Sequence, residues 1–127
     1  MLLGLILPLF AACTSPTAAG SAGTGAVAGS SPAQQLTVKS MDTMKFDPAT
    51  LTAKAGQPIQ VTLDNSGSQL AHDFNITDAV PQPIAISAQP RQKATATFTI
   101  DKPGTYTYLC NQPGHEQAGM KGVLTIQ

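Results

Sequence analysis

The sequence contains no tryptophan, and aromatic residues of all kinds make up only 5% of it. Charge is also scarce, since seven basic and seven acidic side chains give a formal net charge of zero over 127 residues. Nucleic-acid binding depends on clustered Lys and Arg that displace counterions, and single-stranded bases stack on aromatic side chains. The basic residues of this chain are scattered, so the sequence argues against a nucleic-acid partner.

Charge is missing altogether from the first part of the chain. No Asp, Glu, Lys, Arg or His occurs before Lys39, so an uncharged leader precedes a body of mixed charge. The first twelve residues are nearly all apolar, a run too short for a membrane-spanning helix, which needs about 20 residues. Such a run is typical of an export signal. We therefore predict a signal peptide over residues 1–13 and a protein exported to the periplasm or the outer face of the cell membrane.

The end of this leader, Phe10-Ala11-Ala12-Cys13, resembles the lipobox of bacterial lipoproteins, whose cysteine carries lipid. On this interpretation Cys13 anchors the protein to the membrane. Two alternatives stay open: an ordinary signal in which Cys13 is incidental, and a disulfide between Cys13 and Cys110. Residues 14–34 are rich in Ser, Gly, Ala, Thr and Pro and bury too little apolar surface to offset their ordering entropy. They predict a flexible tether, so the whole N-terminal leader is expected to be disordered.

Residues 35–127 alternate apolar and polar side chains in short segments separated by turn residues. Alternation with a period of two and many β-branched residues indicates half-buried β-strands, and several short strands at this spacing indicate a β-sandwich. Clear examples are Leu36–Lys39, Ile59–Asp64 and Thr95–Ile100. Residues 77–92 carry three prolines, and we expect an irregular connection there with at most one short helical turn.

The same alternation places two residues of chemical interest. His72 is in phase with Phe74, and Cys110 is in phase with Tyr106 and Tyr108. Because alternate side chains of a strand share one face, His72 and Cys110 should both point into the core near strand ends. An imidazole and a thiol far apart in the sequence can then meet. Tyr106 is expected to be a structural corner whose hydroxyl ties its strand to a loop.

The segment from Cys110 to Met120 has the spacing C-x4-H-x4-M, with His115 at its centre. Glycines within it allow two bends, so that one loop presents a thiolate, an imidazole and a thioether to a common point. His72 would supply a second imidazole. Two His and one Cys with a weak axial Met form the trigonal set of a blue-copper site, whereas zinc sites more often use Cys and His alone. The sequence therefore predicts one type 1 copper ion held by His72, Cys110, His115 and Met120.

Residues 36–127 resemble the cupredoxins, the type 1 blue copper proteins of the plastocyanin/azurin family. The resemblance is most specific in this loop together with the Gly104-Thr105-Tyr106 segment that precedes the cysteine. Plastocyanins have two residues between Cys and His, so the longer loop resembles the auracyanin group more closely. The resemblance implies an all-β, eight-stranded Greek-key sandwich with copper at one end. It carries the four ligand roles over to the residues just named, and it implies that the Ala71 carbonyl approaches the copper opposite Met120.

Two positions depart from the family pattern. Asp73 follows the first histidine, where many cupredoxins have Asn, and Leu109 replaces the aromatic residue that plastocyanins carry before the cysteine. We expect the backbone N–H of Asp73 or Asn111 to donate to the Cys110 sulfur. We also expect Asn65 to hydrogen-bond across to the Cys110 loop. Such bonds orient the ligands and stabilise the reduced form of the metal.

The resemblance implies outer-sphere transfer of single electrons, because four protein ligands leave no position for a substrate. The expected partners are a quinol-oxidising membrane complex and a cytochrome c, reaction centre or oxidase of a photosynthetic or respiratory chain. A monomer would meet them through an apolar surface around His115. An enzyme of this fold would need more histidines for a catalytic copper, and the sequence has only two. An extracytoplasmic copper carrier or scavenger lipoprotein is the alternative.

Overall fold

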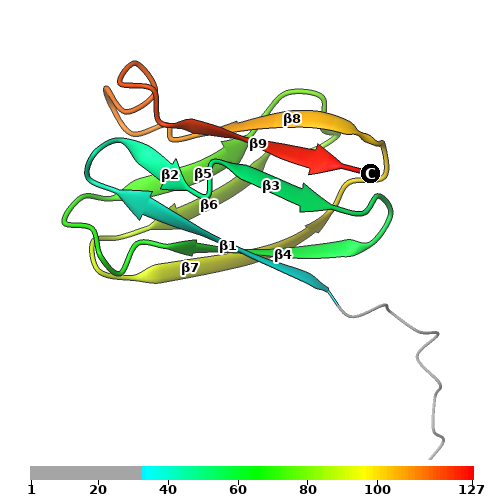
Figure 1. Cartoon of the computed structure of the whole chain (residues 1–127), viewed down its shortest axis with the longest axis horizontal. Helices are drawn as coiled ribbons and strands as arrows, with labels where there is room; N and C mark the ends of the chain where they lie inside the picture. Colours follow the sequence, from blue (N-terminus) through cyan, green and yellow to red (C-terminus); the bar gives the residue numbers. More distant parts are fainter. Residues whose placement is uncertain (1–32) are drawn as a thin grey trace, which may run out of the picture.

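The computed structural model describes residues 33–127, so the predicted signal peptide, Cys13 and nearly all of the predicted tether lie outside the described residues. The described residues form two β-sheets packed face to face, and every regular element among them is a strand (Figure 1). Within this part of the chain, no helix has the length and apolar character needed to cross a membrane. The prediction of an all-β sandwich is confirmed.

Each sheet combines strands from both halves of the described chain. The first sheet has the order β2-β1-β4-β7 and the second the order β3-β9-β8-β5-β6. Strand β1 runs parallel to β4, and β3 runs parallel to β9, whereas the other pairs are antiparallel. The strands are β1 (Gln34–Met41), β2 (Lys45–Asp47), β3 (Thr50–Ala53), β4 (Pro58–Asp64), β5 (His72–Ile76), β6 (Ile84–Ala88), β7 (Lys93–Thr99), β8 (Gly104–Leu109) and β9 (Lys121–Ile126).

The described residues contain nine strands where eight were expected, because the chain changes sheet at Pro48. Before this proline, β2 pairs with β1, and after it β3 pairs with β9. Pro48 has no N–H to donate to a ladder, which favours the end of the first pairing at this point. The hydroxyl of Tyr108 donates to the Pro48 carbonyl oxygen at 3.0 Å, so the crossing point is tied to β8.

The prediction of an irregular connection over residues 77–92 is wrong for part of this range. Ile84–Ala88 forms β6, which pairs with β5 along its whole length, and no helical turn is present between residues 77 and 92. The three prolines, Pro81, Pro83 and Pro90, lie outside the strand, where a missing N–H breaks no ladder bond. The alternation of side chains within β6 was the signal that these prolines obscured.

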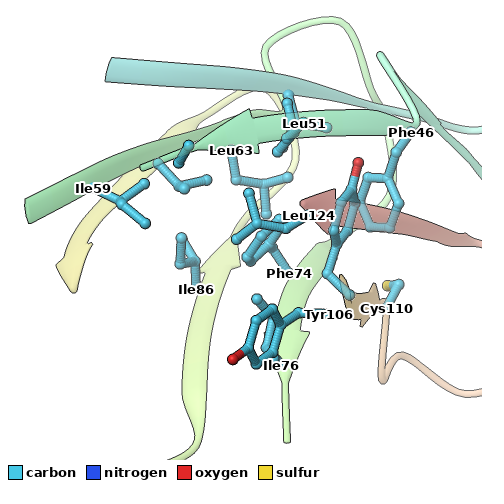
Figure 2. Packing of buried hydrophobic residues seen from close by; sticks show 14 of the residues in the cluster. Phe46, Leu51, Ile59, Leu63, Phe74, Ile76, Ile86, Tyr106, Cys110 and Leu124 are labelled. Carbon is cyan, nitrogen blue, oxygen red and sulfur yellow. The ribbon is translucent and has the colours of Figure 1, made fainter. Parts of the chain in front are cut away.

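The core lies between the sheets and is built from alternate residues of the strands. Ile59, Val61 and Leu63 of β4 are fully buried, as the alternation predicts. Figure 2 shows side chains of both sheets meeting around Leu124, with Cys110 at the margin of the cluster. The chain continues from Cys110 into the loop between β8 and β9, which projects from one end of the sandwich (orange in Figure 1).

An aromatic stack in this core requires a glycine opposite it. The ring of Tyr108 stacks on Phe74 with centroids 4.5 Å apart and meets the edge of Phe46 at 5.1 Å. Gly122 is the register partner of Tyr108 on β9. A Cβ atom at Gly122 would lie 2.3 Å from the Tyr108 ring and 2.6 Å from the Ala49 carbonyl oxygen. Glycine is therefore the residue that lets β9 approach this tyrosine.

We predict that Gly122→Ala destabilises the fold by roughly 1–3 kcal/mol or more, because the new methyl group must displace both a buried ring and a backbone carbonyl. Gly67→Ala is the matched control, since no heavy atom lies within 4 Å of its added Cβ. Urea unfolding of both variants measures the difference. Equal midpoints for the two would contradict this account of the Tyr108 packing.

Asp64, the last residue of β4, anchors the start of the loop that leads to β5. Its carboxylate accepts hydrogen bonds from the hydroxyl and the backbone N–H of Ser66, and it lies 2.9 Å from Nζ of Lys93. The Ser66 hydroxyl, followed by Lys93, lowers the pKa of Asp64 from 3.8 to about 2. The anionic form is therefore the one that the folded state holds.

Asp64→Asn should lower the free energy of unfolding at neutral pH by about 1 kcal/mol. The expected loss is small because the Lys93 side chain is exposed and water screens its attraction to Asp64. A carboxylate with a depressed folded pKa stabilises the fold above its unfolded pKa, here 3.8, and this contribution disappears as the pH falls through about 2. The advantage of the wild type in urea unfolding should therefore shrink between about pH 4 and pH 2. A constant advantage over that range would rule the mechanism out.

Candidate metal centre

Three of the four predicted ligands converge at the end of the sandwich. His72 is the first residue of β5, Cys110 directly follows β8, and His115 lies on the loop between β8 and β9. Their donor atoms all lie within 4.8 Å of one another. The sulfur of Cys110 is 3.9 Å from His72 Nδ1 and 3.4 Å from His115 Nδ1. They meet because β5 and β8 are neighbours in the five-stranded sheet.

The separations between these donors fit a single metal ion. Bond lengths typical of zinc, a divalent ion of similar size to copper, are about 2.3 Å to sulfur and about 2.0–2.1 Å to nitrogen. At roughly 110–120° around one ion they place sulfur and nitrogen about 3.5–3.8 Å apart. The two observed separations, 3.4 and 3.9 Å, lie on either side of this range. The donor set also combines a soft thiol with imidazoles, which suits copper. Residues His72, Cys110 and His115 therefore fit the predicted metal.

Burial shapes the chemistry of these donors. His72 and Cys110 are fully buried, as their strand phase predicted, whereas His115 is only half-buried. Burial, followed by the nearby His115, lowers the pKa of His72 and so favours the neutral imidazole that can bind a metal. Burial also raises the pKa of the Cys110 thiol, which makes an isolated thiolate costly there. A bound cation offsets that cost, because coordination deprotonates a thiol.

The loop between β8 and β9 is held closed by its own backbone. The N–H of Cys110 donates to the Met120 carbonyl oxygen at 3.1 Å, and the N–H of Met120 donates to the His115 carbonyl oxygen at 3.0 Å. Gly114 and Gly119 have φ angles of 82° and 91°, which supply the two bends that the sequence suggested. Met120 itself is fully buried. One short loop thus brings the backbones of three predicted ligands together.

Two backbone amides act on the sulfur. The N–H of Asp73 donates to Cys110 Sγ at 3.3 Å, which confirms that prediction. The Gln112 amide also lowers the pKa of the thiol, and no hydrogen bond from the expected Asn111 N–H reaches the sulfur among the described residues. A turn begins just after Cys110 and is closed by a hydrogen bond from the His115 N–H to the Gln112 carbonyl oxygen. Asn111, at the start of this segment, is exposed. Both amides lower the pKa of the thiol and partly oppose the effect of burial.

Asp73, which directly follows His72, joins the start of β5 to the loop between β8 and β9. Nε2 of Gln112 donates to Asp73 Oδ2 at 3.0 Å. The other carboxylate oxygen, Oδ1, is buried and has no hydrogen-bond partner among the described residues. Asp73 therefore braces the segment of His72 against the loop that carries His115. The predicted approach of the Ala71 carbonyl to the metal stays a prediction.

Asn65 has a different set of partners from the one expected. Its amide Nδ2 donates to the carbonyl oxygens of Leu70 at 2.8 Å, Gln89 at 2.9 Å and Ala88 at 3.1 Å, and its Oδ1 accepts from the Ser40 hydroxyl at 2.7 Å. None of these partners belongs to the Cys110 loop, so the predicted bond across to that loop is wrong. The reason is topological, because the end of β4 lies beside β6 and the loop before His72 instead.

Sequence reasoning also missed the groups behind His72. Its Nε2, which points away from the other ligands, lies 3.0 Å from the Ser68 hydroxyl and 3.6 Å from Asp42 Oδ1. Asp42 comes from the turn between β1 and β2, and no local motif connects that turn with the histidine. The tyrosine corner, in contrast, is confirmed, because the Tyr106 hydroxyl donates to the Lys102 carbonyl oxygen at 2.7 Å.

Asn65→Ala should lower the free energy of unfolding by roughly 3 kcal/mol, because it leaves several buried polar groups without partners. It should also change the visible absorption and the reduction potential of the copper-loaded protein, since the loop before His72 loses its anchor. For the unfolding measurement alone, Asn75→Ala is the matched control, a buried asparagine whose side chain makes one long bond of 3.5 Å to Leu109. A loss of stability no larger than that of the control would refute the anchoring role.

Comparison with protein families matches residues 4–126 to the family described as the cupredoxin-like domain. The copper-resistant cuproprotein CopI of Rubrivivax gelatinosus is 28% identical over 105 residues, which cover 68% of this chain and 62% of that protein. Auracyanin-B of Chloroflexus aurantiacus is 51% identical over 35 residues, 28% of this chain and 15% of that protein. The chain thus spans less than two thirds of the length of these two relatives.

Solved structures agree with the family match. Reduced auracyanin from Roseiflexus castenholzii superimposes with a TM-score of 0.65 at 25% identity, over 78% of this chain and 99% of that chain. The plastocyanin of Scenedesmus fuscus is 32% identical over 89 residues, which cover 65% of this chain and 86% of that protein. Plastocyanins and auracyanins are electron carriers and not enzymes, in agreement with the expectation that this chain is not an enzyme. The chain belongs to the cupredoxin family, and His72, Cys110, His115 and Met120 cluster as its type 1 copper site.

Proposed function

We propose that this cupredoxin carries single electrons between membrane redox complexes of a photosynthetic or respiratory chain. The observation that carries the proposal is the burial of the donor set: His72, Cys110 and Met120 have no exposed surface, and His115 is half-buried. A substrate has no access to a centre closed in this way, whereas an electron needs only a short path through a ligand.

The residues around the site suit a change of one electron. Copper bound there would alternate between Cu(I) and Cu(II). The thiolate of Cys110 and the thioether of Met120 favour the reduced state, and the imidazoles suit both states. The Asp73 N–H at 3.3 Å from the sulfur also favours the reduced state, because it draws charge from the thiolate. The closed backbone of the loop would keep the donors in place in both states.

His115 is the proposed route for the electron. It is the one ligand of the four with exposed surface, and the loop residues around it, Pro113, Gly114 and Ala118, are small or apolar and exposed. Leu70, on the loop before His72, is 41% exposed. A small apolar surface suits brief docking, as in other weak redox complexes. The family implies redox-protein partners in general, and we propose a quinol-oxidising complex as donor and a cytochrome c, reaction centre or oxidase as acceptor.

We further propose that the protein works outside the cytoplasm, anchored by lipid at Cys13. Cupredoxins are usually extracytoplasmic, and the apolar leader followed by a lipobox-like Cys13 supports export with a lipid anchor. The Ser- and Gly-rich stretch over residues 14–34 would act as a tether that lets the copper domain reach its partners at the membrane surface.

A copper carrier or scavenger lipoprotein is the second candidate, because two relatives bear the name copper-resistant cuproprotein CopI. One is from Rubrivivax gelatinosus, and the other, from Pseudomonas aeruginosa, is 36% identical over 61 residues that cover 48% of this chain and 29% of that protein. A carrier must release its ion, whereas an electron carrier must retain it. A reversible one-electron wave in voltammetry with copper retained against a chelator supports electron transfer. Ready loss of copper to the chelator supports the carrier.

We predict that Cys110→Ser abolishes the intense visible absorption of the copper-loaded protein, because that absorption arises from charge transfer between the thiolate and Cu(II). Met120→Leu, a change of similar volume, should keep the absorption and raise the reduction potential, since the thioether would be the weakest of the four donors to copper. Absorption spectra and spectroelectrochemistry of the two variants measure these effects. An unaltered visible band in Cys110→Ser would refute the proposed site.

A further inference from the structure

Behind His72 lies a chain of polar groups that leads from the buried ring to the surface. Nε2 of His72 is 3.0 Å from the Ser68 hydroxyl, and that hydroxyl contacts Asp42 Oδ1. His72 and Ser68 are 0% and 1% exposed, whereas the side chain of Asp42 is 39% exposed. The three groups come from β5, from the loop before it and from the turn between β1 and β2.

The direction of these hydrogen bonds follows from the chemistry of the end group. A carboxylate can only accept, so the single hydroxyl proton of Ser68 goes to Asp42. The Ser68 oxygen must then accept from His72, which places the imidazole proton on Nε2. The lone pair of His72 is therefore on Nδ1, the atom that lies 3.9 Å from Cys110 Sγ. The chain of groups selects the tautomer that can bind the metal.

Asp42 is itself held in place by the loop that precedes His72. Its Oδ2 accepts from the Gln69 N–H at 2.9 Å, and its Oδ1 accepts from the Leu70 N–H at 3.3 Å. The position of this carboxylate behind the ring is thus determined by backbone groups and does not depend on the histidine alone. Although Asp42 is partly exposed, its nearer oxygen is 3.6 Å from the imidazole nitrogen, close enough to act on the charge of a ligated ring.

We propose that Asp42 and Ser68 are positioning residues for the copper site, which fix the tautomer and orientation of His72 and stabilise the oxidised metal. Copper(II) carries one more positive charge than Cu(I), and a carboxylate behind a ligand interacts more favourably with the higher charge. A hydrogen-bond acceptor behind a ligating imidazole also raises its basicity. Both effects lower the reduction potential, in opposition to the amide N–H groups on the sulfur. This inference rests on the proposed copper site.

The test uses the copper-loaded full chain and three variants. Asp42→Asn removes the charge and keeps an oxygen that can accept from the loop amides. Ser68→Ala breaks the chain between Asp42 and His72. Asp78→Asn is the matched control, because it removes the same charge from an exposed loop position outside the site. Spectroelectrochemistry gives the reduction potential, a chelator competition gives the Cu(II) affinity, and ¹⁵N NMR of the full chain before copper loading reports which imidazole nitrogen of His72 carries the proton.

In the wild type we expect a proton on Nε2 of His72. The reduction potential should be higher in Asp42→Asn and in Ser68→Ala than in Asp78→Asn. Ser68→Ala should also lose Cu(II) affinity by about 10-fold or more. Should the potential of Asp42→Asn equal that of Asp78→Asn while the wild type shows its visible band, this inference fails and the copper site stands. A wild type without that band overturns the copper site and this inference together. Ser68→Ala and the NMR measurement keep the test decisive if Asp42→Asn does not fold.

Discussion

The site depends on the contact between the start of β5 and the end of β8. A single register pair, Asn75 with Leu109, joins these strands, and beyond it the Asp73 N–H donates to the Cys110 sulfur at 3.3 Å. At the end of the β5–β8 ladder, the Cys110 sulfur accepts the hydrogen bond that a backbone carbonyl oxygen would accept within the ladder. This contact puts the buried imidazole of His72 beside the thiol, and it ties the β8–β9 loop to a strand from another part of the chain.

The metal donors are an extension of the hydrophobic core and share its dielectric environment. Cys110 and Met120 belong to the same buried cluster as Phe74 and Tyr108. Burial disfavours both a thiolate and an imidazolium, so it raises the pKa of Cys110 and lowers that of His72. The same burial leaves His72, Cys110 and Met120 without exposed surface. A site of this kind favours a soft ion that changes its charge without changing its ligands.

Each ligand is supported by different contacts, and the supports act on the metal in opposite directions. Cys110 and His115 are held by a loop that closes on its own backbone, whereas His72 is backed by Ser68 and Asp42 from other parts of the fold. Amide N–H groups draw charge from the sulfur and favour reduced copper, and the carboxylate behind the imidazole favours oxidised copper. The balance between these two influences is a property of the whole end of the sandwich.

The sequence by itself determined the sandwich and its inward faces, because strand alternation is a local pattern, and the C-x4-H-x4-M spacing marked Cys110, His115 and Met120. His72 lies outside that spacing and was assigned from its strand phase and from the resemblance to the cupredoxins. Tertiary structure alone decided where Asn65 donates, which amide besides that of Asp73 acts on the sulfur, and that Asp42 lies behind His72. It also decided that the chain changes sheet at Pro48. Hydrogen-bond partners distant in the sequence depend on how loops from different strands meet at one end of the fold, and no local pattern encodes that meeting.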